Sequence, residues 1–378
     1  MIIRSFHHSD PAFMAQALRL ARRGLFSTHP NPRVGCVLVK AGEIVGEGWH
    51  RRTGEPHAER LALAAAGERA RGATAYVTLE PCCHQGHTPP CSEALIAAGV
   101  TEVVAAMQDP NPLVAGQGFA YLETAGIAWT CGLLASEARA LNPGFICRMT
   151  RRRPYVRVKL AMSLDGRTAM ANGESRWITS PDARRDVHRL RAQSAAILTS
   201  IGTVQADDPS LDVRLTQEDL GLSGDLSVPT PIRVVLDPDL IISPTARLLG
   251  LPGQTLVFCR PGQARPLTGA AVIESPAEGK GNRLDLGAVL TELAAREINE
   301  VLVEAGPTLA GTFLQAGLAD ELVIYLAPHL MGDDARGLLT LPGLTRLDQR
   351  LELDILDLRA IGRDWRITAR PYLPFSDP

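Results

Sequence analysis

The spacing of hydrophobic residues predicts alternating helices and strands in the first part of the chain. Apolar residues at helical spacing begin after Asp10, which we take as the N-cap, and stop at Gly24. Beyond this helix, short apolar runs predict strands and longer periodic segments predict helices. The strands cover 34–39, 43–49, 73–80, 100–106 and 127–130, and the helices cover 56–70, 91–98 and 116–125. Strands that alternate with helices in this way indicate an α/β sandwich.

The same alternation continues after a helix-rich piece at 136–149. Predicted strands lie at 155–162, 195–200, 231–236, 255–259, 271–274 and 320–327, and predicted helices lie at 181–193 and 284–298. Three arginines at 151–153 precede Pro154 between the two parts. We interpret them as a solvated linker and not as a nucleic-acid patch, because the rest of the chain is not basic. Since 378 residues exceed one typical domain, we expect two domains, 1–150 and 151–378.

The composition of the chain limits which binding partners and which cellular compartment we expect. A net charge of −2 gives no general attraction to nucleic acid or to a membrane surface. No apolar run approaches the ~18 residues of a membrane span, and the N-terminus has no apolar signal core. Three of the seven cysteines cluster at 82–91 and the others are scattered, which indicates metal binding in a reducing compartment. We therefore expect a cytoplasmic protein.

The clustered cysteines combine with a histidine and a glutamate into a candidate zinc site. His57-Ala58-Glu59 has the H-x-E form of the nucleobase deaminases, in which the glutamate is not a ligand. Cys82 follows a proline at the end of a predicted strand, and Cys91 opens a predicted helix nine residues later, where the spacing of that class would be three. The intervening residues can loop out and return Cys91 to the metal. We predict Zn²⁺ held by His57, Cys82 and Cys91, with Glu59 moving protons between a water molecule and the leaving ammonia.

Other ligand sets remain open at this point. Cys83 or His84 could take the place of Cys82. A structural zinc would need four protein ligands, and His84 or His87 could supply the fourth. In that case the protein would be an interaction module that zinc holds together, and not an enzyme.

Two further patterns could carry chemistry in the second part. A strand from Glu300 runs into Gly306 and then a helix, and backbone N–H groups at a helix N-terminus bind phosphate. This is not the G-x-G-x-x-G pattern, so the common dinucleotide fold is not indicated, and a plain turn explains the glycine equally well. The pair Asp207-Asp208 before Pro209 could be acid–base machinery, although turn formation is the commoner use.

These motifs together resemble the bifunctional riboflavin-biosynthesis deaminase/reductase family. HAE at 57–59 and PCCHQGHTPPC at 81–91 look like its deaminase half, and KLAMSLDGRTA at 159–169 and EAGPTLAG at 304–311 look like its reductase half. The resemblance covers about residues 10–370, in the order of the family. It implies a cytidine-deaminase-like α/β/α sandwich followed by a dihydrofolate-reductase-like α/β domain. It also implies zinc-dependent deamination of 2,5-diamino-6-(5-phosphoribosylamino)-pyrimidin-4-one and then reduction of its ribosyl group by NADPH.

The resemblance assigns further residues by position. On the cofactor side these are Ala161, Trp177, Thr203, Asp207, Gly306, Pro307, Thr308, Leu309, Ala310, Gly311 and Thr312. On the substrate side they are Ser175, Arg191, Leu211, Arg214 and Glu304, with Asn31 as a candidate in the deaminase half. Arginines suit a ribose phosphate because the guanidinium offers a bidentate fork. From the sequence alone, Arg191 is not distinguished from Arg184, Arg185 and Arg189, and Asn31 could be a plain turn residue.

One competing enzyme hypothesis is a deaminase that acts on a base in RNA, with the second part as a binding module. It would require a basic, aromatic-rich face, whereas the net charge is −2 and aromatic residues make up 4% of the chain. The expected partner is therefore a small pyrimidine ribotide, with no nucleic acid and no membrane. The resemblance also implies that copies of the chain can associate through the reductase half.

Overall fold

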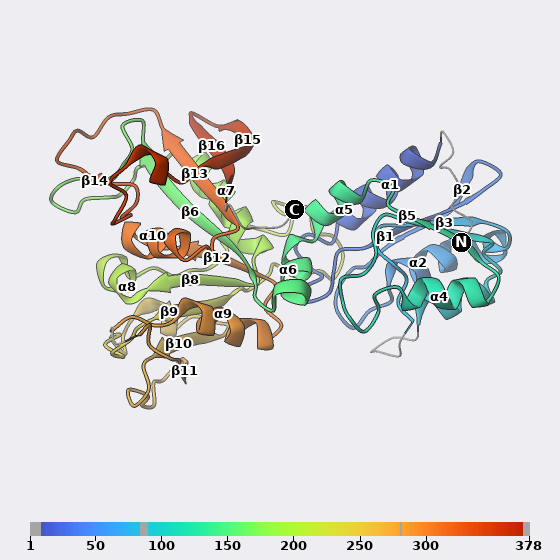
Figure 1. Ribbon diagram of the computed structural model, residues 1–378, viewed down its shortest axis with the longest axis horizontal. Helices are drawn as coiled ribbons and strands as arrows, with labels where there is room; N and C mark the ends of the chain where they lie inside the picture. The colour runs from blue at the N-terminus through green and yellow to red at the C-terminus, as the bar shows by residue number, and fades with distance from the viewer. Residues whose placement is uncertain (1–8, 84–89, 280–281, 373–378) are drawn as a thin grey trace. The chain divides into compact units, whose positions relative to one another are not determined.

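The computed structural model describes residues 9–83, 90–279 and 282–372, and the chain forms two compact units. Unit 1 contains Met1–Arg152 together with a short later segment, Leu222–Ser227. Unit 2 contains Arg153–Gly221 and Val228–Pro378. Each unit has its own sheet (Figure 1). Each also has its own hydrophobic core.

Unit 1 is built on a five-stranded sheet in the order β2-β1-β3-β4-β5. The strands are β1 (Gly35–Lys40), β2 (Glu43–Trp49), β3 (Thr74–Val77), β4 (Glu102–Ala105) and β5 (Ala128–Cys131). β1 is antiparallel to both β2 and β3, and β3, β4 and β5 run parallel. The parallel strands bring the segments that follow β3 and β4 to one edge of the sheet.

Helices cover both faces of this sheet. They are α1 (Asp10–Arg22), α2 (Ala58–Ala66), α3 (Cys91–Ala97), α4 (Gln117–Thr124), α5 (Ala135–Leu141) and α6 (Pro143–Arg151), with a 3₁₀ turn η1 (Gly67–Ala70). Apolar residues of α2, α3 and α4 pack on one face, and those of α1 and α5 pack on the other. The result is the α/β/α sandwich expected from the sequence.

A short segment from the middle of the chain completes unit 1. Leu222 and Leu226 are 9% and 3% exposed, and Asp225 between them is exposed. The carboxylate of Asp225 pairs with Arg51 at 2.6 Å and with Arg52 at 2.7 Å. Residues about 170 positions apart therefore fold together.

Unit 2 is built on a nine-stranded sheet in the order β11-β10-β9-β8-β12-β6-β13-β16-β15. Its strands are β6 (Tyr155–Ser163), β8 (Ala196–Ser200), β9 (Ile232–Leu236), β10 (Thr255–Cys259), β11 (Ala271–Glu274), β12 (Glu300–Glu304), β13 (Glu321–Ala327), β15 (Leu353–Ile361) and β16 (Asp364–Pro371). Only β16 and β15 at one edge run antiparallel to their neighbours. A separate two-stranded sheet pairs β7 (Arg167–Ala169) with β14 (Arg336–Gly337).

The helices of unit 2 divide the sheet into two different faces. They are α7 (Pro181–Gln193), α8 (Ile201–Asp207), α9 (Leu286–Ala295) and α10 (Pro307–Gln315), with 3₁₀ turns η2 (Arg247–Leu249) and η3 (Leu347–Gln349). α9 and α10 pack on the face formed by Val156, Val158 and Leu160, which is apolar. α7 packs on the opposite face, against Leu302, Val323 and Tyr325.

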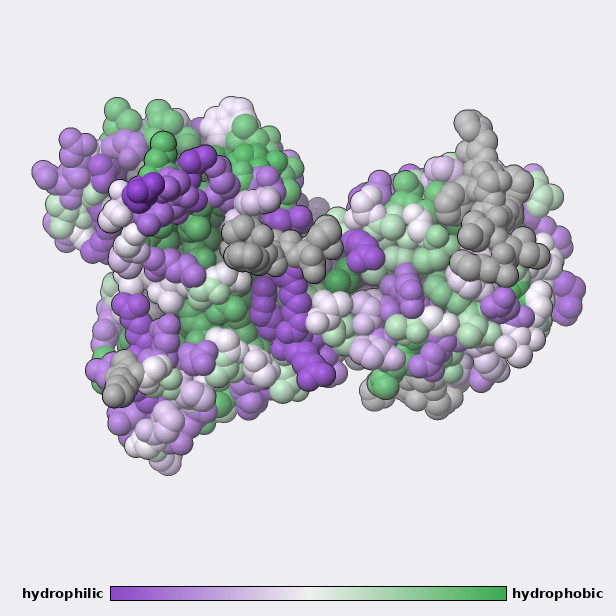
Figure 2. Space-filling model, viewed as in Figure 1, coloured by the Kyte–Doolittle hydropathy of each residue, from purple (hydrophilic) through white to green (hydrophobic). Residues whose placement is uncertain are grey.

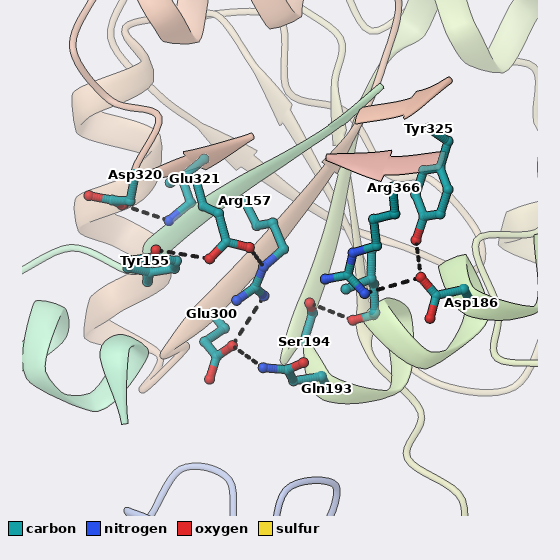
Figure 3. A network of polar contacts seen from close by, with 12 residues as sticks. Tyr155, Arg157, Asp186, Gln193, Ser194, Glu300, Asp320, Glu321, Tyr325 and Arg366 are labelled. Atoms are coloured by element: carbon teal, nitrogen blue, oxygen red, sulfur yellow. Dashed lines mark hydrogen bonds and ion pairs between the residues drawn. The ribbon is translucent and has the colours of Figure 1, made fainter. Parts of the chain in front are cut away.

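The face under α7 also carries buried charges near the amino ends of the strands (Figure 3). Arg157 on β6 is 4% exposed and lies 2.6 Å from Glu321 and 3.3 Å from Glu300. Farther along, the Tyr325 hydroxyl donates to Asp186 at 2.6 Å, and Arg366 donates to the same carboxylate at 3.1 Å. A buried guanidinium is stable only when carboxylates or other acceptors lie next to it. Because the partners of Arg157 lie on the two neighbouring strands, these ion pairs favour one register between the strands.

The structure differs from the predicted elements in several places. Asp10 is the first helical residue of α1 and not its N-cap, and its buried carboxylate accepts a hydrogen bond from Tyr76 at 2.6 Å. The helical piece at 136–149 is two helices, because Pro143 starts α6 directly after α5. The hairpin of β15 and β16 and the helix α8 were not predicted.

Candidate active sites

Three side chains in unit 1 converge on one point. His57 is the N-cap residue of α2, Cys82 lies in the loop after β3, and Cys91 is the first residue of α3. The Nδ1 atom of His57 is 3.6 Å from the sulfur of Cys82 and 3.3 Å from that of Cys91. Tetrahedral ligands at the usual zinc distances would stand roughly 3.5–3.8 Å apart. The donor set and its spacing therefore fit one zinc ion.

The sulfur atoms are prepared for metal binding by their surroundings. Hydrogen bonds from Cys91 and His57 lower the pKa of the Cys82 thiol to about 4. The backbone N–H of Cys91 also donates to that sulfur at 3.3 Å. The contact with Cys82 and burial raise the pKa of the Cys91 thiol, and a metal ion bound there would displace its proton.

Glu59 lies beside these ligands in the first turn of α2. It is 3% exposed, and burial together with the charge of Cys82 raises the pKa of its carboxyl group. A carboxylate with a raised pKa is suited to exchanging protons near neutral pH. Among the described residues, the His/Cys/Cys cluster does not include Cys83 or Glu59. His84 and His87 lie outside the described residues.

A histidine that the sequence did not single out lies against this cluster. The ring of His50 is 5.2 Å from that of His57, and Asn31 Nδ2 is 3.0 Å from His50 Nε2. With Nδ1–H directed to the Pro56 carbonyl at 3.3 Å, the hydrogen bonds are consistent with one neutral tautomer. Burial and the nearby His57 lower the pKa of His50 to about 4. Asn31 thus contacts His50, and His50 in turn lies against the proposed ligand His57. His50 directly follows β2, and no sequence motif indicated a role for it.

Two of the predicted substrate residues of unit 2, Arg191 and Glu304, belong to a largely buried charge cluster. Arg191 on α7 makes a bidentate pair with Glu304 at the end of β12, with distances of 2.6 and 2.8 Å. Burial alone would raise the pKa of Glu304, but Arg191 and then Lys159 lower it. Lys159 on β6 was not predicted, and burial lowers the pKa of its ammonium group. The alternation of apolar and charged residues at 155–160 could have revealed it, because it places Arg157 and Lys159 on one face of a central strand.

Other predicted substrate residues lie in the segments around this cluster. The Arg191 guanidinium also donates to the Asp212 carbonyl at 2.9 Å. Leu211 is buried, whereas the Arg214 side chain is 64% exposed. The backbone N–H of Arg214 donates to His188 on α7 at 3.1 Å, so α7 fixes this loop. Ser175 is partly buried in the loop before α7.

The predicted cofactor residues follow the carboxyl ends of parallel strands, where open α/β sheets bind ligands. Ala161 lies on β6, and Thr203 and Asp207 lie in α8 directly after β8. Gly306 is the N-cap residue of α10, and Pro307, Thr308, Leu309, Ala310, Gly311 and Thr312 lie in that helix. A Cβ atom at Gly311 would be 2.0 Å from the Thr340 carbonyl oxygen, so packing requires glycine there. Trp177 is 69% exposed, with the Arg184 guanidinium 4.5 Å from its ring centroid.

Both halves of the chain match known families. Residues 7–107 match the cytidine and deoxycytidylate deaminase zinc-binding region, and residues 154–367 match the RibD C-terminal domain. The riboflavin biosynthesis protein RibD of Escherichia coli (strain K12) is 55% identical over 358 residues, which cover 94% of this chain and 97% of the relative. This chain belongs to the RibD family.

Solved RibD structures share the architecture over nearly the full length. Acinetobacter baumannii RibD, form 1, aligns with a TM-score of 0.88 and 45% identity over 97% of this chain and 99% of that one. A Thermotoga maritima diaminohydroxyphosphoribosylaminopyrimidine deaminase/5-amino-6-(5-phosphoribosylamino)uracil reductase aligns with a TM-score of 0.85 and 33% identity over 97% and 99%.

Membership in the RibD family confirms the expected fold class and activities. The chain is a bifunctional enzyme of riboflavin biosynthesis, with a zinc-binding deaminase domain and an NADPH-using reductase domain. Its substrate is a small molecule of that pathway, and the alternative of an RNA deaminase is not favoured. No helix in the described part of the chain is long and apolar enough to cross a membrane.

Proposed function

We propose that residues 1–150 deaminate 2,5-diamino-6-(5-phosphoribosylamino)-pyrimidin-4-one and that residues 151–378 then reduce its ribosyl group to a ribityl chain. The observation that carries the proposal is the convergence of His57, Cys82 and Cys91 beside the buried Glu59, in a chain of the RibD family. This arrangement supplies three ligands and a proton-transfer group and leaves one tetrahedral position for water.

In unit 1, His57, Cys82 and Cys91 would hold the zinc. Zinc held there would supply a nucleophile at neutral pH by lowering the pKa of a water molecule. Glu59 would accept a proton from the water and return one to the departing ammonia. Asn31 orients the pyrimidine ring, with its own side chain held by the neutral His50.

In unit 2, the segment from Gly306 to Thr312 would receive a phosphate of NADPH at the start of α10. Ala161, Trp177, Thr203 and Asp207 would complete the cofactor side. The cofactor supplies the hydride, and the chain orients the sugar that accepts it. Arg214 is exposed and suited to the ribose phosphate, whereas Arg191 is already paired with Glu304. We therefore propose that Arg191 orients Glu304 toward the substrate, with Lys159 beside them. Ser175 and Leu211 would complete the substrate side of the site.

The direct test is NADPH oxidation by the zinc-loaded enzyme, started with the diaminopyrimidine ribotide. For Glu59→Gln we expect ammonia release to fall about 10²–10⁴-fold while zinc stays bound, because the carboxylate moves protons and does not bind the metal. NADPH oxidation from the same substrate should fall equally, and oxidation started with the deaminated ribotide should be unchanged.

The matched control is Glu93→Gln, the same change at an exposed first-turn position of the neighbouring helix α3. It should leave both rates unchanged. Loss of zinc from Glu59→Gln would make Glu59 a ligand, and an unchanged ammonia rate would exclude it as the proton carrier.

We further propose that two copies associate through the β15 edge of unit 2. An edge strand offers unpaired backbone groups to a partner strand. Leu353, Ile355, Leu356 and Leu358 on β15 are 39–58% exposed, and Figure 2 shows hydrophobic side chains at the place that β15 and β16 occupy in Figure 1. Ile355→Lys should reduce the mass measured by sedimentation equilibrium from that of a dimer to that of a monomer; an unchanged mass would exclude this edge.

The remaining proposals concern partners and location. The net charge of −2 supports a protein that binds no nucleic acid. None of the seven cysteines, all of which lie in the described residues, forms a disulfide, which supports work in the reducing cytoplasm.

A further inference from the structure

A buried carboxylate lies two residues before the proposed ligand Cys82. Glu80 is 3% exposed, and its two oxygens accept hydrogen bonds from four backbone N–H groups. Oε2 accepts from Asp109 at 3.1 Å and from Gly116 at 3.0 Å. Oε1 accepts from Gly118 at 2.9 Å and from Phe119 at 3.4 Å. Such a concentration of donors on one side chain fixes its position strongly.

The four donors come from two separate segments. Asp109 lies in the loop that follows β4, and the other three lie at the start of α4. The same turn of α4 also contacts the chain between Glu80 and Cys82 directly. A Cβ atom at Gly118 would be only 2.1 Å from the Pro81 carbonyl oxygen, so only glycine allows this approach. Glu80 thus connects the loop that carries Cys82 to two neighbouring elements of unit 1.

Cys82 is held on its other side by the start of α3. The backbone N–H and the hydroxyl of Ser92 donate to the Cys82 carbonyl at 3.1 and 3.0 Å. These contacts fix Cys82 relative to Cys91, because Ser92 is the next residue. Residues 80–82 are held relative to β4 and α4 by the Glu80 carboxylate and the Pro81–Gly118 contact, together with the backbone N–H of Glu80, which donates to the Met107 carbonyl at 3.0 Å.

We propose that Glu80 is a positioning residue for the zinc centre, which fixes the Cys82 loop so that its sulfur meets His57 and Cys91. This rests on the proposed assignment of Cys82 as a ligand. Replacing either oxygen of Glu80 by an amide NH₂ group would set a donor against two of the four N–H groups. The unsatisfied donors would push the loop from its place, and the sulfur would shift with it.

The test compares Glu80→Gln with Asp10→Asn. Asp10 is also a buried carboxylate of unit 1, but it accepts from Tyr76 on the opposite face of the sheet from the zinc helices. Two properties are measured on the full-length protein: transfer of zinc to a chromophoric chelator, and the visible spectrum after cobalt replaces zinc. We expect Glu80→Gln to bind zinc about 10–100-fold more weakly and to alter the cobalt spectrum. Asp10→Asn should lower Tm without changing either property.

Zinc affinity within about twofold of the parent and an unchanged cobalt spectrum in Glu80→Gln would overturn the proposal. If that variant does not fold, Glu80→Asp serves instead, because a shorter carboxylate cannot reach all four amides and should give an intermediate loss of zinc affinity. Zinc affinity in Glu80→Asp equal to that of the parent would then overturn it.

Cys82→Ser distinguishes a failure of the proposed role of Glu80 from a failure of the assignment of Cys82 as a zinc ligand. If Cys82→Ser loses zinc and Glu80→Gln does not, only the role of Glu80 is wrong. If Cys82→Ser keeps zinc at the affinity of the parent, the ligand assignment fails, and the role of Glu80 fails with it.

Discussion

The zinc cluster of unit 1 and the charge cluster of unit 2 are assembled in opposite ways. The zinc cluster takes its three ligands from 35 consecutive positions, 57–91, and two of these ligands, His57 and Cys91, lie at the starts of helices. The charge cluster joins side chains from β6, α7 and β12 that are as much as 145 positions apart, such as Lys159 and Glu304. Its two cations, Lys159 and Arg191, share the buried carboxylate of Glu304.

This difference determines which substitutions should abolish each activity. A metal site depends on a few irreplaceable side chains and on the backbone that places them. A buried cluster of opposite charges depends on balance, so removing one member leaves another uncompensated. Variants of unit 1 should therefore lose chemistry before stability, and variants of the unit 2 cluster should lose stability as well.

The largest effect is expected for Cys91→Ser. Because loss of a merely supporting group weakens metal binding about 10–100-fold, loss of a ligand should weaken it more than about 100-fold. Ammonia release should disappear, while reduction of the deaminated ribotide continues and the far-ultraviolet circular dichroism is retained. Cys83→Ser is the control and should keep zinc, since Cys83 is outside the cluster. Zinc loss from Cys83→Ser would restore the alternative ligand set, and unfolding of unit 1 without metal would indicate a structural zinc.

The next effect is expected for Arg191→Met. It removes the bidentate pair with the buried Glu304 but leaves Lys159 as a neighbouring cation, so the loss should stay below the ~3–5 kcal/mol that leaving a buried charge unpaired costs. Urea unfolding should show this loss. The control Arg214→Ala removes an exposed arginine, so it should change stability by less than about 0.5 kcal/mol. It should instead raise the KM for the ribotide in the reductase step and leave ammonia release intact; a loss of both activities would argue against separate sites.

A smaller, pH-dependent effect is expected at His188. Burial, and then Arg191 and Arg214, lower its pKa to about 4, although Glu304 and Asp212 oppose them. The ordinary value is about 6.5, so between these pH values the unfolded chain binds more protons. Its contribution to stability is thus complete above pH 6.5 and lost as the pH falls through 4. His188→Gln should reduce the difference in unfolding free energy between pH 7.5 and 4.5 by about 1–2 kcal/mol, after discounting for partial exposure. An unchanged difference would contradict this assignment.

The smallest effect is expected for Asp225→Asn. The ion pairs with Arg51 and Arg52 are exposed, so water and dissolved salt screen them strongly. The variant should unfold at nearly the parental urea concentration, with an even smaller difference in high salt, and both reactions should proceed at the parental rate. A large loss of stability would mean that the segment is held by this carboxylate and not by Leu222 and Leu226.

The zinc cluster could be predicted from the sequence because histidine and cysteine are characteristic zinc ligands and because the helices that begin at His57 and Cys91 are recognisable from their patterns. The sequence did not predict the pairing of Arg191 with Glu304, since nothing local distinguishes that arginine from its neighbours on α7. The core strands were recovered because they are continuously apolar. The β15–β16 hairpin was missed because most of its apolar side chains are exposed, so its pattern does not show a buried face. The place of Asp225 depends on a contact about 170 positions away, which no local pattern records.

The segment Leu222–Ser227 has a consequence for how the two activities could be separated. A gene split at the linker would leave the first product without the apolar side chains of Leu222 and Leu226, and the second product with those same residues exposed. Two separate proteins would therefore need compensating changes on both sides of the cut. Covalent continuity between the two halves is therefore a condition for the complete packing of unit 1, and simple gene fission would remove it.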